Sequence, residues 1–143
     1  MKKLWLSVAV VLTAAGLGTG DDAEKDLKKL TGTWEEVSHT ADGKAMAADE
    51  VKGHTVVIEA SGKWEAFKDG TSIVKGTLIK LDPAKKPRAV DWAIEGSDMV
   101  AKGIYEVDGD TWKHCFSLAD RPTEFGSKEG SGVHYVVLKR VKK

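Results

Sequence analysis

LTGTWEEVS, residues 30–38, marks the point where the chain changes from a helical pattern to a β-strand pattern. Just before it, Leu27 and Leu30 lie three positions apart, which predicts one short amphipathic helical turn over residues 24–30. Gly32-Thr33-Trp34 then opens a long region in which no helical period survives. We therefore predict that a short helical plug precedes the first β-strand, which begins at Gly32.

Short β-rich runs follow, and turn signals separate them. Breaks such as Asp42-Gly43, Asp69-Gly70 and Asp108-Gly109 are typical of hairpins. Alternation is clearest in residues 90–95 and 111–116, where one face is large and mainly apolar. The predicted strands are 32–40, 54–60, 63–69, 71–82, 89–96, 101–108, 111–118 and 133–142.

Hairpin-linked strands with one apolar face must bury that face. Closing into a barrel does so and also removes the exposed edges of the sheet. A sandwich is the alternative, but the nearly equal strand spacing and the short turns favour an up-and-down meander. The sequence thus predicts an all-β fold, an eight-stranded up-and-down antiparallel barrel with a short N-terminal helical plug.

Residues 1–20 have the pattern of a secretory signal peptide. Lys2 and Lys3 give a positive start, residues 4–17 are uncharged and mostly apolar, and small residues follow. This apolar run is shorter than the roughly 20 residues that a membrane span needs. We therefore predict a signal peptide at 1–20, a linker and plug at 21–31, and the barrel domain at 32–143. The product is expected to be exported, periplasmic or secreted, with no membrane span after cleavage.

The charge balance excludes some classes of partner. The chain has 22 basic and 22 acidic side chains, and removal of Lys2 and Lys3 leaves 20 basic ones, a net charge near −2. Without a strong basic excess, we expect no nucleic-acid partner and no membrane-surface partner. Cys115 is the only cysteine, so no intrachain disulfide can form, and we expect it to be packed inside a strand.

The Gly-x-Trp on the first strand belongs to a wider pattern. A helical plug precedes it, and an arginine, Arg140, follows near the end of the last predicted strand. Together these features resemble the lipocalin, or calycin, signature. The resemblance implies that Gly32, Trp34 and Arg140 form a structural signature in which the guanidinium packs over the indole, a favourable contact.

Residues 27–140 also resemble a more specific group, an uncharacterised lipocalin-like domain family abundant in exported planctomycete proteins. That family has no established activity, so the resemblance implies a fold and no reaction. The matching segments are LTGTW at 30–34, Gly76-Thr77, LDPAKKP at 81–87, GIYEVDGD at 103–110, Cys115-Phe116, RPTEF at 121–125 and LKR at 138–140.

Four tryptophans lie in the predicted barrel: Trp34, Trp64, Trp92 and Trp112. Each falls in the first half of an odd-numbered predicted strand, and such strands run in the same direction. If the side chains point inward, the indoles gather at one end and fill it, since an eight-stranded barrel is only just wide enough for side chains or one small ligand. We predict that this end is closed and that the plug caps it. Trp64 is the least certain, because Phe67 lies on the opposite face of its strand.

The two longest predicted connections, 41–53 and 119–132, both follow odd-numbered strands and should therefore flank one mouth at the other end. This places a predicted ligand site at that mouth, formed by His39, Met46, Val51, Arg121, Glu124, Phe125 and Lys128. The alternative, which the sequence favours slightly, is that residues 121–125 are a structural clasp. In that case Phe125 is tucked into the barrel top and Glu124 caps backbone amides.

Other chemistry has little support in the sequence. His114 and His134 are expected on adjacent strands, but no third metal ligand is evident, so we predict no metal and no cofactor. No nucleophile motif and no phosphate-cradling loop is present. Carboxylates such as Glu35, Glu36 and Glu65 mostly alternate with apolar residues, which is typical of a solvated outer face.

Two hypotheses for the function remain. The first is an exported, non-enzymatic, lipocalin-like protein that binds a small, partly apolar ligand at the barrel mouth. The alternative is a filled barrel that acts as a protein–protein interaction or inhibitor module in the cell envelope. An empty interior would favour the first hypothesis.

Overall fold

The structure, a computed structural model, describes residues 21–142, so the predicted signal peptide lies outside the described residues. Within this range the chain is mostly β-strand. Two short helices are present, and the fold in chain order is α2 (Asp21–Leu30), β1 (Gly32–Ala41), β2 (Lys44–Ala45), α3 (Ala48–Val51), β3 (His54–Ile58), β4 (Lys63–Lys68), β5 (Thr71–Asp82), β6 (Arg88–Ile94), β7 (Val100–Asp108), β8 (Thr111–Ser117) and β9 (His134–Arg140).

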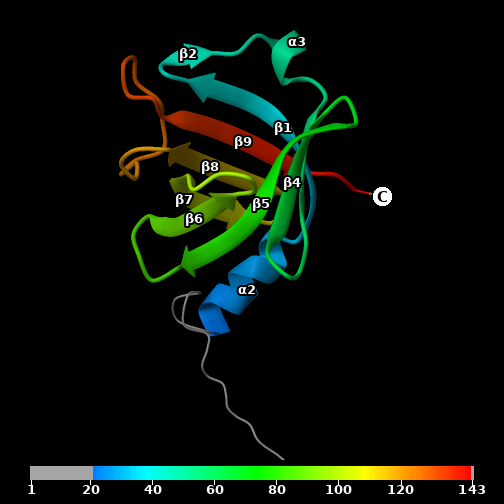
Figure 1. The fold of residues 1–143 in the computed structure, drawn as a ribbon, viewed down its shortest axis with the longest axis vertical. Coiled ribbons are helices and arrows are strands. Elements are labelled where there is room, and N and C mark those ends of the chain that lie inside the picture. The colour runs from blue at the N-terminus through cyan, green and yellow to red at the C-terminus, as the bar shows by residue number, and fades with distance from the viewer. Residues whose placement is uncertain (1–20, 143) are drawn as a thin grey trace, which may run out of the picture.

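Eight of the strands form a closed antiparallel barrel. From β3 to β9 each strand pairs with the next, β1 pairs with β3, and the pairing of β1 with β9 closes the circle (Figure 1). The short strand β2 pairs only with the end of β1. The predicted all-β fold, an up-and-down barrel with a short helix before it, is confirmed. The strand β2 and the helix α3 were not predicted.

The hairpin turns follow the predicted chemistry. Asp42-Gly43 and Asp69-Gly70 have positive φ at both residues, 51° and 81° in the first turn and 52° and 82° in the second. A type I′ turn needs this geometry, which glycine adopts freely and aspartate tolerates. These two turns therefore set the register of the hairpins at the ends of β1 and β4.

The four tryptophans all point into the barrel and contact one another. Trp112 packs against Trp34 and Trp92, with ring centroids 5.6 Å and 5.9 Å apart, and Trp64 packs edge-to-face on Trp92 at 5.9 Å. We call these four side chains the indole layer. The predicted gathering of the indoles is confirmed, and Trp64 takes part in it. Since large rings fill the cross-section here, this end of the barrel is closed.

The helix α2 lies at the lower end of the barrel in Figure 1, where its leucines pack beneath the indole layer. Leu30 is fully buried, Leu27 packs against the core, and Trp34 Nε1 donates a hydrogen bond to the carbonyl of Leu30 at 2.8 Å. The predicted plug is therefore confirmed. Its leucines supply the apolar contact, and the indole fixes the end of the helix against β1.

The predicted signature residues meet beside the plug. The guanidinium of Arg140 lies 4.3 Å from the ring centroid of Trp34, and its Nη1 donates to the carbonyl of Thr31 at 2.9 Å. Gly32 has a φ of +134°, and a Cβ there would lie 2.9 Å from Nη1 of Arg140. The backbone conformation therefore favours glycine, and a Cβ there would also displace the guanidinium of Arg140.

A buried carboxylate ties the plug to the barrel wall. Asp26, which is 3% exposed, accepts hydrogen bonds from Arg88 Nη1 at 2.8 Å and from Tyr105 Oη at 2.7 Å. Burial raises the pKa of the Tyr105 phenol, and the hydrogen bond to Asp26 adds to this shift, so the phenol remains a proton donor.

Replacing Asp26 with alanine is expected to lower the free energy of unfolding by about 1–3 kcal/mol, because the buried Tyr105 hydroxyl loses its acceptor. Urea denaturation followed by circular dichroism measures this loss. Tyr105→Phe should cost much less in the Asp26→Ala background than in the native protein, and the control Asp22→Ala, at an exposed position of α2, should cost little. If Asp26→Ala and Asp22→Ala lowered the free energy of unfolding equally, the proposed stabilising role of the Asp26 hydrogen bonds would be wrong.

Candidate functional site

The upper half of the barrel contains a cavity of about 380 Å³. Trp64, Trp92 and Trp112 of the indole layer lie on its wall nearest the closed end, and aliphatic side chains of β3 to β7 line much of the rest. Ile73 and Leu118 also line it and are each 55% exposed, so the cavity reaches the surface there. The interior is therefore filled at the α2 end and hollow at the other end.

All four histidines of the chain, His39, His54, His114 and His134, lie on the cavity wall. They come from four different strands, β1, β3, β8 and β9. The sequence analysis expected His114 and His134 on adjacent strands and placed His39 at the mouth. His54 is a site residue that the sequence analysis missed, although its place at the start of a predicted strand was correct.

One side of the cavity is a column of stacked rings. His114 stacks on Trp112 with centroids 5.2 Å apart, Phe116 stacks on His114 at 4.8 Å, and His134 stacks on Phe116 at 4.9 Å with an interplanar angle of 6°. The first three are consecutive inward positions of β8, and His134 comes from the neighbouring strand β9. Because both faces of Phe116 are covered, the column presents ring edges to the cavity.

The hydrogen bond of His114 fixes its protonation. Trp92 Nε1 can only donate, and it lies 2.8 Å from His114 Nε2, so Nε2 is the acceptor and the ring proton is on Nδ1. Burial lowers the pKa of His114 to about 3, and the neighbouring His39 and His134 add to the shift. His114 is therefore uncharged at neutral pH.

At the mouth, Glu36, His39 and His134 form a hydrogen-bonded triad. His39 Nδ1 lies 3.0 Å from Glu36 Oε1, and His39 Nε2 lies 3.0 Å from His134 Nδ1. The carboxylate can only accept, so His39 Nδ1 carries a proton. Burial lowers the pKa of His134, an effect that His39 reinforces and that Glu36 and Asp42 partly oppose.

A β-bulge in β1 brings the triad together. Trp34 and Glu36 point inward at the usual spacing of two, and the register of β1 against β9 then shifts between Glu36 and Ser38. Because of this extra residue, Val37 is exposed and His39, three positions after Glu36, also points inward. Strict alternation predicts opposite faces for Glu36 and His39.

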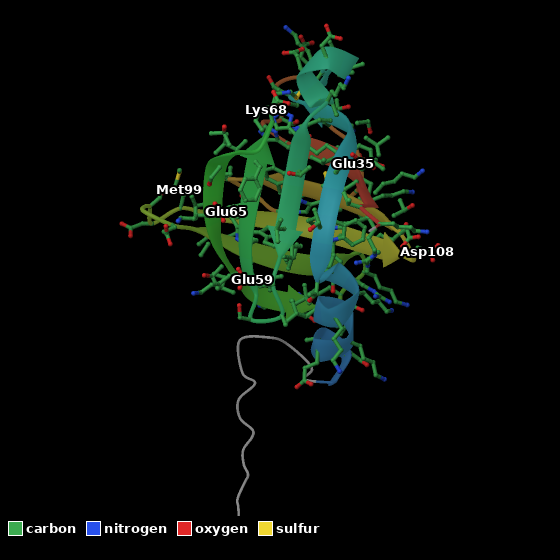
Figure 2. The ribbon with its side chains drawn as sticks, turned by 90° about the vertical axis from the view of Figure 1, so that its right-hand side faces the viewer. Glu35, Glu59, Glu65, Lys68, Met99 and Asp108 are labelled. Carbon is green, nitrogen blue, oxygen red and sulfur yellow. The ribbon has the colours of Figure 1, made fainter. Side chains whose placement is uncertain are left out.

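The assignment of Glu36 to the solvated outer face is therefore wrong. The same assignment holds for Glu35 and Glu65, which lie on the outer face of β1 and β4 in Figure 2. The difference between Glu35 and Glu36 lies in their parity from Trp34, which places Glu36 inside. The even spacing of Glu36 from Trp34 was the signal in the sequence for a carboxylate inside the barrel. The neighbouring surface glutamates made this signal easy to overlook.

The two long connections lie side by side at the mouth, as predicted. Gly43 N donates to Ser127 Oγ at 2.8 Å, and Gly132 N donates to Asp42 Oδ1 at 2.9 Å. Of the predicted mouth residues, His39 and Met46 line the cavity. Val51 is instead buried where α3 packs, away from the cavity wall.

The remaining predicted mouth residues lie elsewhere. Arg121 donates to the carbonyls of Val90 at 3.0 Å and Gly103 at 2.9 Å and pairs with Asp91 at 2.6 Å. Phe125 packs on Tyr135 with centroids 6.2 Å apart. Glu124 and Lys128 are exposed and pair with each other at 3.4 Å. None of these four residues, Arg121, Glu124, Phe125 and Lys128, lines the cavity.

The segment 121–126 acts as a clasp on the outside of the barrel. Ile104 and Cys115 point outward, opposite in parity to the lining residues, yet they are buried. Cys115 Sγ lies 3.3 Å from the carbonyl of Gly126, and burial raises the pKa of this thiol. The segment is therefore a clasp, but both predicted details are wrong: Phe125 packs on Tyr135 and does not line the cavity, and Glu124 pairs with Lys128 instead of capping backbone amides.

No family model, curated protein or solved structure matches this chain. Among residues 21–142, no helix has the length and apolar character that crossing a membrane requires. In the same range, no group of three or more histidine, cysteine or acidic side chains is arranged to hold a metal ion. The geometry of the cavity is therefore the basis for a functional assignment.

Proposed function

We propose that this protein is an exported, non-enzymatic, lipocalin-like binding protein that holds a small, partly apolar molecule in the upper half of the barrel. The observation that carries the proposal is the cavity of about 380 Å³ in the upper half of the barrel, which reaches the surface at Ile73 and Leu118. Small-molecule sites occupy roughly 300–1,000 Å³, so the cavity suits a ligand at the small end of that range.

The wall of the cavity supports a partly apolar ligand. Aliphatic side chains such as Val56, Val74 and Ile94 line the cavity, and the polar side chains on its wall are few: Glu36 and the four histidines. Apolar walls with a few placed polar groups are typical of ligand sites. The alternative, an interaction module with a filled barrel, fits this interior poorly, because only the α2 end is filled.

Filling the cavity is expected to abolish binding. Ala66 lines the cavity, so Ala66→Phe places a ring in the ligand volume, whereas Thr77→Phe adds the same ring at an exposed position of β5. The neutral fluorescent probe N-phenyl-1-naphthylamine should bind the native protein and Thr77→Phe alike. Its affinity for Ala66→Phe should fall by about tenfold or more, since steric exclusion costs over 1.4 kcal/mol.

Fluorescence titration measures the affinity, and circular dichroism checks that both variants are folded. Equal probe affinity in all three proteins would mean that the probe binds outside the barrel, and it would sink the proposal. Native mass spectrometry of protein purified from its host adds an independent readout, since a co-purified small molecule should be absent from Ala66→Phe.

A further inference from the structure

The fixed charge on the cavity wall has only one sign, which is negative. Glu36 is the only carboxylate among the lining side chains, and no lysine or arginine lines the cavity within the described residues. Burial lowers the pKa of both His114 and His134, so neither carries charge at neutral pH. Glu36 therefore gives the wall its one fixed charge, which is negative.

The triad also has a direction. With His39 neutral, its Nδ1–H donates to Glu36, its Nε2 accepts from His134 Nδ1–H, and His134 Nε2 is left with a lone pair. Each hydrogen bond polarises the next, so the negative charge of Glu36 strengthens His134 Nε2 as an acceptor. Asp42, next to the mouth, adds further negative charge near His134.

Because His134 Nε2 accepts hydrogen bonds and Glu36 carries a negative charge, the triad favours a ligand group that donates hydrogen bonds. An ammonium group both donates hydrogen bonds and carries the opposite charge, and hydrogen bonds to charged groups are the stronger ones. A carboxylate would lie near Glu36 with no cation to balance it, and burying an unpaired charge is costly. The cavity therefore disfavours organic anions.

We propose that the cavity binds organic ammonium ions of small size, with the ammonium group at Glu36 and His134 in the mouth and the apolar body directed toward the indole layer. This inference rests on the proposed binding function and names its ligand class. The cavity volume of about 380 Å³, with Trp92 and Trp112 on the wall toward the closed end, accommodates the body of such a ligand.

A matched set of three ligands tests the charge preference. Phenethylamine, 2-phenylethanol and 3-phenylpropionate share a phenyl ring and a two-carbon spacer and differ in carrying a cation, a neutral group or an anion. Isothermal titration calorimetry on the full folded protein at pH 7 should give the highest affinity for the amine, about tenfold above the alcohol, and the lowest for the carboxylate.

Glu36→Gln should remove this preference. The amide keeps the size of the side chain and an acceptor for His39 but not the charge, so the amine should lose about tenfold in affinity while the alcohol changes less than about twofold. Glu35→Gln is the matched control, because Glu35 is exposed on the outer face of the same strand (Figure 2). It should leave all three affinities unchanged.

The outcomes separate this inference from the proposed function. If the neutral probe binds in a manner that Ala66→Phe abolishes, but the amine binds no better than the alcohol or the carboxylate binds best, the cavity binds ligands and the ammonium preference is wrong. An amine preference that survives Glu36→Gln also overturns the inference. If neither the probe nor any of the three ligands binds, both proposals fail.

Discussion

Replacing Trp34 with alanine is expected to lower the free energy of unfolding by about 3–5 kcal/mol, the usual cost of truncating a fully buried large aromatic side chain. Trp34 is 0% exposed and contacts structure on three sides. It packs edge-to-face on Trp112, it lies under the guanidinium of Arg140, and it donates to the carbonyl of Leu30. The variant therefore loses contacts with the barrel core, with the helical plug and with Arg140 of β9 at the same time.

Urea denaturation followed by far-ultraviolet circular dichroism measures this loss, since the substitution itself changes the fluorescence. Trp34→Phe keeps an aromatic ring but loses the indole N–H, so it should cost less than the alanine variant. Val37→Ala is the control on the same strand, because Val37 is exposed. A loss below about 1 kcal/mol for Trp34→Ala, the range of ordinary surface changes, would contradict the central place of this indole.

Acid is expected to destabilise the protein through His114. The unfolded chain binds a proton on this ring near the ordinary histidine pKa of 6.5, whereas the folded protein binds it only near a pKa of about 3. Between these values the unfolded state holds the extra proton, so stability falls as pH falls. The limiting slope is about 1.4 kcal/mol per pH unit. Above pH 6.5 the ring is neutral in both states and contributes no pH dependence.

His114→Gln isolates this effect. The amide oxygen can accept from Trp92 Nε1 and does not titrate, so the variant should lose about 2–3 kcal/mol less than the native protein between pH 7 and pH 4.5. Urea denaturation at both pH values gives the comparison, and Lys102→Gln, at an exposed position of β7, serves as the control. Parallel losses in the native protein and His114→Gln would show that acid acts elsewhere.

The sequence was a good guide to the barrel because its pattern is local. Turns such as Asp69-Gly70 need a backbone that few residues adopt, and alternation in residues 111–116 separates an inner from an outer face. The four tryptophans could be placed together because strand parity and direction follow from an up-and-down order. Only β2 and α3, both very short, were missed.

The site was harder to predict because it depends on exceptions to alternation. The bulge after Glu36 has no marker such as glycine in the sequence, so the inward position of His39 beside Glu36 followed only from the structure. Phe125 was misplaced for a different reason. It is an apolar residue in one of the two long connections, which predicts a place at the mouth. In the structure it packs on Tyr135, and its loop lies against the outer face at Cys115.

The seam between β1 and β9 has a consequence for how the chain folds. It joins Trp34 to Arg140, nearly the full length of the described chain apart, and contacts between such distant residues carry a high entropic cost before they form. The indoles come from four strands, β1, β4, β6 and β8, none of which pairs with another. The contact between Trp34 and Trp112 joins β1 to β8 across β9, so it forms only with this last pairing, and the change in intrinsic fluorescence that it causes reports the closure of the cylinder.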